Sequence, residues 1–181
     1  MPNKIILKNK VSSFYKTIWI PGDKCISIRW VLISSLASGV SKAKNLLISD
    51  DVLAAIKSIQ TLGVKVLNKK GVCKIYGVGV NGYKYKKNLV INAQNSGTLG
   101  RLISGILIDT PFPIKIIGDK SLSKRDFKRI TKPLSKFGAS FQLHNNYSLP
   151  LIVKGSKKLN PIRFFEDKGS AQCKSSVIFG G

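Results

Sequence analysis

The chain has 181 residues, enough for one ordinary domain, and 43% of them are hydrophobic, which excludes a disordered composition. Its 31 lysine and arginine residues stand against 8 acidic residues, giving a net charge of +23, so anionic ligands and nucleic acids are both candidate partners. No apolar run approaches the roughly 20 residues that a membrane-spanning helix needs, and the N-terminus lacks a secretory signal pattern.

Apolar periodicity in the first half of the chain predicts alternating strands and helices. The expected elements are a strand over 17–20, a helix over 26–38, a strand over 46–48, a helix over 50–62, and hairpin strands over 64–67 and 74–78. Ser49 or Asp50 is expected to cap the second helix, with Asp51 favourable in its first turn and Gly63 ending it.

The second half repeats this order. The expected elements are a strand over 89–93, a helix over 98–108, a strand over 114–117, a helix over 123–137, strands over 140–143 and 151–153, a strand over 162–165 and a helix that begins near Ser170. Pro133 falls inside the fourth of the predicted helices and is expected to kink it, and Gly138 is expected to end it.

A long period organises these elements. Lys24, Gly97 and Ser170 occupy equivalent polar loops and follow one another at intervals of 73 residues. A fixed period of this kind indicates copies of one supersecondary unit. We therefore predict an α/β (α+β) fold of repeated β-α-β-α-β-β units, over about 17–80, 88–155 and 160–181, with two units complete and the third truncated. Residues 1–16 would be a leader or a strand belonging to another domain.

Each polar loop lies between the first strand and the first helix of its unit. Helix N-termini carry unpaired N–H groups and the positive end of the helix dipole, so they bind anions. The side chains at these loops suit phosphates and carboxylates: Lys24 and Arg29; Asn95, Thr98 and Arg101; Ser170, Gln172 and Lys174. Arg125 adds a further cation. The alternative for each residue is an ordinary cap or a solvated surface charge.

Other kinds of site find little support. The only histidine, His144, lies in a predicted turn, and the few acidic residues leave almost no candidates for a paired-carboxylate mechanism. Cys25, Cys73 and Cys173 are far apart, which argues against a disulfide framework or a zinc site and favours a reducing compartment, the cytoplasm. The lysines are scattered, with no nucleic-acid-binding motif, so the charge alone predicts only non-specific, salt-sensitive binding to DNA.

Four segments, in order, resemble motifs of the 5-enolpyruvylshikimate-3-phosphate (EPSP) synthase family. The chain has PGDKCISIR from Pro21 where the family has P-G-S-K-S-x-S-x-R, and NSGTLGR from Asn95 where it has N-A-G-T-x-x-R. GDKSLSKR from Gly118 resembles G-D-x-S-L-x-x-R-P, and SAQCKS from Ser170 resembles S-A-Q-x-K-S. The resemblance covers residues 18–181.

This resemblance implies an inside-out barrel domain and transfer of the enolpyruvyl group of phosphoenolpyruvate to the 5-hydroxyl of shikimate 3-phosphate. This step of the shikimate pathway serves aromatic amino-acid biosynthesis and needs no cofactor or metal. Motif matches assign the shikimate 3-phosphate site to Lys24, Cys25, Arg29, Ser170, Ala171 and Gln172. They assign the phosphoenolpyruvate site to Lys24, Gly97, Arg125 and Gln172, with Asn95, Thr98, Arg101 and Lys174 in support. Full-length members are expected to be monomers.

The chain departs from the family pattern at three points. Cys25 replaces a serine, and Asp126 and Phe127 replace proline and methionine. The second domain, which in the family carries the acid–base carboxylates, is absent, so the chain is expected to be a fragment that is inactive alone. Two alternatives stay open: the related UDP-N-acetylglucosamine enolpyruvyl transferase, whose first loop typically carries Lys-Asn, and a basic nucleic-acid-binding module.

Overall fold

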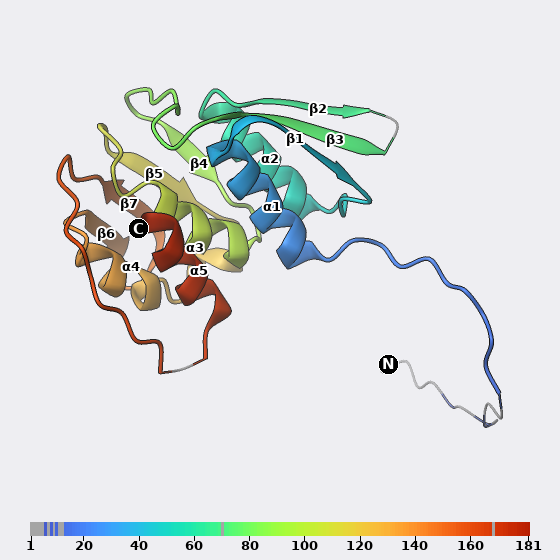
Figure 1. Cartoon of the computed structure of the whole chain (residues 1–181). Coiled ribbons are helices and arrows are strands. Elements are labelled where there is room, and N and C mark those ends of the chain that lie inside the picture. The colour runs from blue at the N-terminus through green and yellow to red at the C-terminus, as the bar shows by residue number, and fades with distance from the viewer. Residues whose placement is uncertain (1–5, 7, 9, 11–12, 70, 168) are drawn as a thin grey trace.

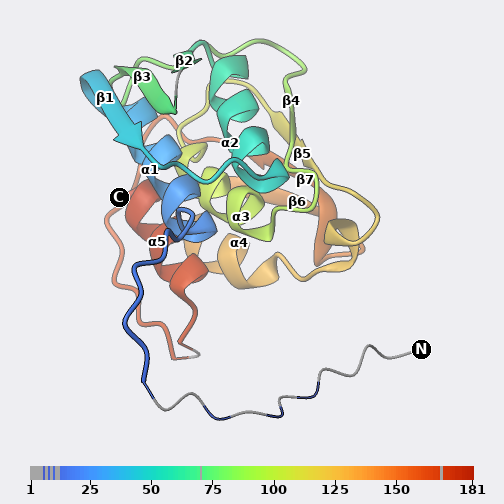
Figure 2. The same cartoon turned by 90° about the vertical axis from the view of Figure 1, so that its right-hand side faces the viewer.

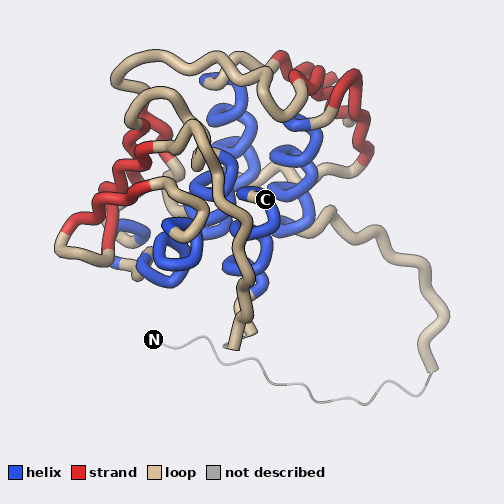
Figure 3. The backbone as a smooth tube through the Cα atoms, turned by 60° about the vertical axis from the view of Figure 1, so that its left-hand side comes forward, coloured by secondary structure: helices blue, strands red, loops and turns tan. Residues whose placement is uncertain are grey.

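A computed structural model describes residues 6, 8, 10, 13–69, 71–167 and 169–181. Its strands form two separate sheets, and helices fill the space between them (Figures 1 and 3). The helices are α1 (Lys24–Leu36), α2 (Asp50–Thr61), α3 (Gly97–Ile106), α4 (Lys128–Ser135) and α5 (Ala171–Gly180), with a 3-10 turn, η1 (Leu122–Lys124). The strands are β1 (Ser38–Lys44), β2 (Lys65–Lys69), β3 (Val72–Val78), β4 (Val90–Asn92), β5 (Ile114–Ile117), β6 (Ser140–His144) and β7 (Ser148–Lys154).

The two sheets share a strand order. The first is antiparallel with the order β1-β3-β2, and the second has the order β4-β5-β7-β6, in which only β4 and β5 are parallel. If β4 is set aside, the remaining strands of the second sheet follow the same pattern as the first, with the last strand in the middle. In both sheets, therefore, the last strand of the hairpin pairs with a strand that lies before the preceding helix in the sequence: β3 pairs with β1, and β7 pairs with β5.

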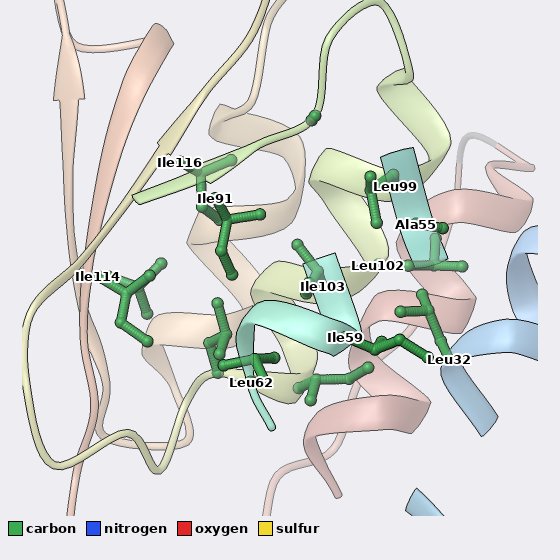
Figure 4. Packing of buried hydrophobic residues seen from close by; sticks show 14 of the residues in the cluster. Leu32, Ala55, Ile59, Leu62, Ile91, Leu99, Leu102, Ile103, Ile114 and Ile116 are labelled. Carbon is green, nitrogen blue, oxygen red and sulfur yellow. The ribbon is translucent and has the colours of Figure 1, made fainter. Parts of the chain in front are cut away.

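One hydrophobic core joins the sheets and the helices. Ile59 of α2 and Leu62, which follows the last residue of α2, meet Leu102 and Ile103 of α3 at its centre, and each of these side chains is fully buried (Figure 4). Ile91 of β4 lies on the sheet side of the same cluster. Both α1 and α3 pack on this core, so the core sets the orientation of these two helices and of their N-termini.

Most predicted elements are confirmed. The helices expected over 26–38, 50–62 and 98–108 correspond to α1, α2 and α3. The strand over 114–117 is confirmed at both ends, and both predicted hairpins are present with slightly longer strands. Gly63 and Gly138 have φ values of +90° and +108°, the left-handed backbone that ends a helix most easily at glycine.

The strand predicted over 46–48 is wrong. The strand lies earlier, at Ser38–Lys44, and Leu46 and Leu47 instead pack against the core from a connecting loop. The inward positions of β1 hold the small residues Ser41 and Ala43, since they pair with the inward Ile75 and Cys73 of β3. An apolar pattern search therefore cannot find this strand, whose pairing with β3 defines it.

The strands predicted over 17–20 and 162–165 are also wrong. Both segments are irregular, and residues 13–20 leave the body of the protein as an extended stretch (Figures 1 and 2). A strand requires a partner for its N–H and C=O groups. The Asn45 side chain donates one hydrogen bond to the Ile20 carbonyl, at 3.2 Å, but no ladder forms there. The predicted leader, residues 1–16, lies largely outside the described residues.

The helix predicted over 123–137 is divided. A 3-10 turn, η1, comes first, Arg125 then takes an extended conformation, and α4 begins only at Lys128. Asp119 explains the early start of the turn, because its carboxylate accepts a hydrogen bond from the Leu122 N–H at 2.7 Å. Pro133 is accommodated inside α4.

Asp109 should make stability depend on pH. Tyr85 donates a hydrogen bond to its carboxylate at 3.5 Å, but burial raises the pKa of Asp109 above the ordinary 3.8. The folded state thus binds the proton more tightly than the unfolded chain does, so this group's contribution to stability falls as the pH rises from about 4 through the raised pKa. In urea titrations between pH 4 and 7, Asp109→Asn should remove that fall and be more stable than wild type at pH 7. Parallel pH profiles for the two proteins would contradict this assignment.

Candidate anion-binding site

Three helices, one after each of the three polar loops, begin with side-chain caps. Asp23 accepts a hydrogen bond from Ile26 N–H at 2.7 Å at the start of α1, and Ser96 caps α3 through Leu99 N–H at 3.2 Å. Ser170 caps α5 by accepting from Cys173 N–H at 3.3 Å, which is the ordinary cap that the sequence left open as the alternative to a binding role. Each cap occupies one N–H of the first turn and leaves others available to a ligand.

Polar contacts bring these three helix N-termini together. The Cys25 thiol of α1 lies 3.9 Å from the Thr98 hydroxyl of α3, to which the Gln172 amide of α5 donates a hydrogen bond at 3.1 Å. Arg101 of α3 donates to the Gln172 side-chain oxygen at 2.7 Å. Four predicted site residues from three helices therefore form one connected network.

Arg29 of α1 links α1 to α5 through a hydrogen bond. Its Nε donates to the Ser175 hydroxyl at 3.1 Å, and one terminal nitrogen donates to the Cys25 carbonyl at the same distance. The Ser176 hydroxyl in turn donates to the Arg101 carbonyl at 2.8 Å, which ties α5 to α3. These contacts fix the relative positions of the three helices.

Two guanidinium groups meet over Gly97. A Cβ atom at this glycine would lie 2.9 Å from an Arg101 nitrogen and 3.2 Å from an Arg125 nitrogen, so only glycine leaves both in place. Burial is the main reason that the pKa of Arg101 is lowered, and repulsion from Arg125 and Arg129 adds to it. Cations held this close together favour an anion between them. Arg101 also lies over the Phe127 ring, 5.1 Å from its centroid.

Lys24 faces the same region. Its ammonium group forms an ion pair with Asp51 of α2 at 2.8 Å, and that hydrogen bond is the main cause of its raised pKa, which nearby Arg125 opposes. The sequence interpretation placed Asp51 only in the first turn of α2 and missed this partner. Nothing local in the sequence announces it, since the pair joins residues on two different helices.

The loops before α3 and η1 are also tied together. The Asn95 side chain donates to the Asp119 carboxylate at 2.5 Å, and Asp119 N–H donates to the Gln94 carbonyl at 2.7 Å. A cavity of about 430 Å³ lies here, with Asp50 and Asp51 among its lining residues on one side and Asn95 and Asp119 on the other. The candidate site therefore has a polar, acidic margin beside its cations.

Lys174 lies apart from this network, where it borders an apolar cavity with Phe137 and Val177. Ala171 is exposed at the start of α5, and its carbonyl accepts a hydrogen bond at 2.8 Å from the Ser175 hydroxyl that Arg29 contacts. A cavity of about 490 Å³ between α4 and residues 163–167 is separate as well. We place the site where the three helices begin because the polar contacts converge there.

The described residues contain no group of three or more histidine, cysteine or acidic side chains that could hold a metal ion. No helix in the described part of the chain has the length and apolarity needed to cross a bilayer. Cys25, Cys73 and Cys173 are free thiols. The arrangement can bind and orient anions, because it presents helix N-termini, cations and amides to the same space.

Comparison with known proteins points in the same direction. The family model for EPSP synthase (3-phosphoshikimate 1-carboxyvinyltransferase) matches residues 8–181. Proteins named 3-phosphoshikimate 1-carboxyvinyltransferase from Desulforamulus reducens and Streptococcus suis are 43% and 41% identical over 96% of the chain. The matches cover 40% and 41% of those proteins, so the chain spans about two-fifths of their length. The solved EPSP synthase from Acinetobacter baumannii superposes with a TM-score of 0.85 and 34% identity, over 91% of this chain and 38% of that one.

Proposed function

The chain belongs to the EPSP synthase family, and we propose that it forms the part of a 3-phosphoshikimate 1-carboxyvinyltransferase that binds the anionic groups of both substrates. The reaction would transfer the enolpyruvyl group of phosphoenolpyruvate to the 5-hydroxyl of shikimate 3-phosphate and release phosphate. One observation carries the proposal most directly: residues from the first turns of α1, α3 and α5 form one polar network beside Lys24, Arg101 and Arg125.

We assign the two substrates to opposite sides of this network. Shikimate 3-phosphate would lie by Cys25 and Arg29 of α1 and the N-terminus of α5 at Ser170, where two helix N-termini and a guanidinium are close together. Phosphoenolpyruvate would lie over Gly97 against Arg125. Gln172 and Lys24 stand between these regions and would contact both, while Asn95, Thr98 and Arg101 support them.

The contribution to the reaction would be orientation and charge neutralisation. Both substrates carry phosphate and carboxylate groups, which repel one another in water. Cations and helix N-termini that hold them side by side remove that repulsion and make the encounter effectively intramolecular. In this scheme the acid–base groups come from the second domain of the family, so the residues described here bind rather than transfer protons.

Two substitutions give this site its own character. A thiol at Cys25 is a weaker hydrogen-bond donor than the serine hydroxyl of the family motif, so the contact with the carboxylate of shikimate 3-phosphate would be weaker. Phe127, which replaces methionine, is fully buried and lies under Arg101. Its ring face attracts the guanidinium and holds it near Gly97.

We also propose that the fold consists of repeated units. The matching strand orders of the two sheets support units over about 17–80 and 88–155, although no strand precedes α1 among the residues that the structure describes. The capped start of α5 supports a third copy of the motif over 160–181. Residues 1–16 would belong to a second domain, and the full-length enzyme would be a cytoplasmic monomer.

Ligand binding to the 181-residue chain tests the proposed function. In calorimetric titrations, shikimate 3-phosphate should bind, and phosphoenolpyruvate should bind more tightly when shikimate 3-phosphate is present. Binding of UDP-N-acetylglucosamine instead would favour the related transferase. Preference for an oligonucleotide, with an affinity that falls steeply with the logarithm of salt concentration, would favour a nucleic-acid-binding module.

An activity assay gives a second prediction. The 181-residue polypeptide alone should release no measurable phosphate from the two substrates, because the acid–base groups assigned to the second domain contribute about 10²–10⁴-fold each. A purified chain that turns over at the rate of the Desulforamulus relative would overturn this division of roles.

A further inference from the structure

Asp119 lies where the two loops of the phosphoenolpyruvate region touch. One carboxylate oxygen accepts the Leu122 N–H at 2.7 Å and starts η1, and the other accepts the Asn95 amide at 2.5 Å. Its own N–H donates to the Gln94 carbonyl at 2.7 Å. A single exposed side chain therefore joins the loop before α3 to the loop that ends in Arg125.

These bonds determine where the backbone of Arg125 lies. The turn that Asp119 caps ends with the Arg125 N–H donating to the Leu122 carbonyl at 3.0 Å, after which the backbone becomes extended. The Arg125 guanidinium then reaches the space over Gly97, two residues after Asn95. Asp119 is thus bonded both to the loop before α3 and to the loop that carries Arg125, whose guanidinium lies over Gly97.

The negative charge of Asp119 allows a geometric role to be distinguished from an electrostatic one. A carboxylate close to cations lowers their attraction for a phosphate, so an acid beside an anion site weakens binding by its charge alone. The pKa of Asp119 is lowered, chiefly by the Leu122 N–H and further by Asn95 and Arg125, so the group is ionised at neutral pH. A geometric role for Asp119 would have to outweigh this electrostatic cost.

Resting on the proposed function, we propose that Asp119 is a positioning residue. It holds Asn95 and the Arg125 loop in register so that the guanidinium and the N-terminus of α3 meet one phosphate together. It does not touch the substrate. Its removal should therefore weaken anion binding although it removes a negative charge.

Asp126 provides the matched control. It is also an exposed acid beside Arg125, and its carboxylate accepts the Lys128 N–H at 2.6 Å at the start of α4. It caps one backbone N–H, as Asp119 does, but makes no described bond to the loop before α3. Asp119→Ala and Asp126→Ala thus delete the same charge and the same kind of cap, and only the first breaks the connection between the loops.

The experiment titrates inorganic phosphate into the ¹⁵N-labelled 181-residue chain and follows the Gly97 amide and the Arg125 side-chain N–H by NMR. Asp119→Ala should weaken binding by about tenfold or more, since a displaced Arg125 loses a charge-assisted hydrogen bond to the phosphate, which lowers affinity by about that factor. Asp126→Ala should leave the affinity unchanged or raise it, by up to about fivefold, as expected for loss of one exposed charge. Tighter binding in both variants would overturn the proposal.

Amide exchange separates this inference from the proposed function. If wild type shows no response to phosphate at Gly97 or Arg125, the anion site itself is wrong. The positioning role is then decided by the exchange rates of the Leu122 and Arg125 amides. They should rise in Asp119→Ala and not in Asp126→Ala, and equal rates in the two variants would exclude Asp119 as the connection between the loops.

Discussion

Replacing Lys24 by alanine is expected to weaken shikimate 3-phosphate-dependent binding of phosphoenolpyruvate strongly, with little loss of stability. The ammonium group lies near Arg125 and beside the starts of α1 and α3, where both phosphates are proposed to lie. A hydrogen bond between charged groups contributes about 1.5–3 kcal/mol, so each affinity should fall by about 10- to 150-fold. In a chain extended by the family's second domain, turnover should disappear with it.

Stability should change far less. The ion pair with Asp51 is partly exposed, with 47% of the Lys24 side chain accessible, and such pairs contribute between zero and about 1 kcal/mol. Calorimetric titration of Lys24→Ala should therefore show a large loss of ligand affinity, whereas urea unfolding should show a nearly unchanged free energy of unfolding. The control is Lys42→Ala, which removes the same charge from the exposed strand β1 and should change neither quantity. Equal ligand affinities in wild type and Lys24→Ala would mean that Lys24 is an ordinary surface charge.

The ion pair between Lys24 and Asp51 also has a consequence for ligand binding. Lys24 is already bonded to Asp51, so a phosphate that recruits the ammonium group competes with a carboxylate or shares it. Sharing costs less, because the three donors of an ammonium group can serve both partners. Asp51 would then hold Lys24 in place before the substrate arrives, which reduces the side-chain entropy lost on binding.

The sequence predicted α1, α2, α3 and α5 to within a few residues, because helix ends depend largely on local rules, but it missed the division of 123–137 into η1 and α4. A cap bonds to an N–H three residues later, and a glycine at positive φ ends a helix, so both leave a local signature. For this reason the start of α5 near Ser170 and the end of α2 at Gly63 agree with the sequence, and the 73-residue interval predicts equivalent positions for the three candidate anion-binding loops. The motif resemblance then supplied the roles.

The contacts between elements far apart in the sequence could not be predicted in the same way. The strand β1 exists because of its pairing with β3, and its own residues are mostly small or polar. The bonds from Gln172 to Thr98 and Arg101 join residues more than 70 positions apart. Only the packing of α3 against α5 brings them together, and periodicity within either helix says nothing about it. The geometry of the site therefore depends on that helix contact.

Gly105→Ala tests the contact between α3 and α5 directly. The residue lies inside α3, where alanine is preferred over glycine by about 1 kcal/mol, so helix propensity alone predicts a more stable protein. The structure predicts the opposite. A Cβ atom at Gly105 would lie 2.0 Å from the Ser176 carbonyl oxygen of α5, a backbone atom that cannot turn aside as a side chain could.

The helices must therefore separate, and the Gly105→Ala protein should lose about 3 kcal/mol of unfolding free energy, at the upper end of overpacking effects. Separation would also break the bonds of Gln172 to Arg101 and Thr98, so shikimate 3-phosphate binding should fall together with stability. Gly181→Ala is the control, because a Cβ atom there meets Phe137 at an ordinary 3.6 Å. Urea unfolding and amide exchange within α5 measure the effect. If Gly105→Ala is as stable as Gly181→Ala and protects the α5 amides equally well, the close packing of α3 on α5 is wrong, and the network that depends on it is wrong as well.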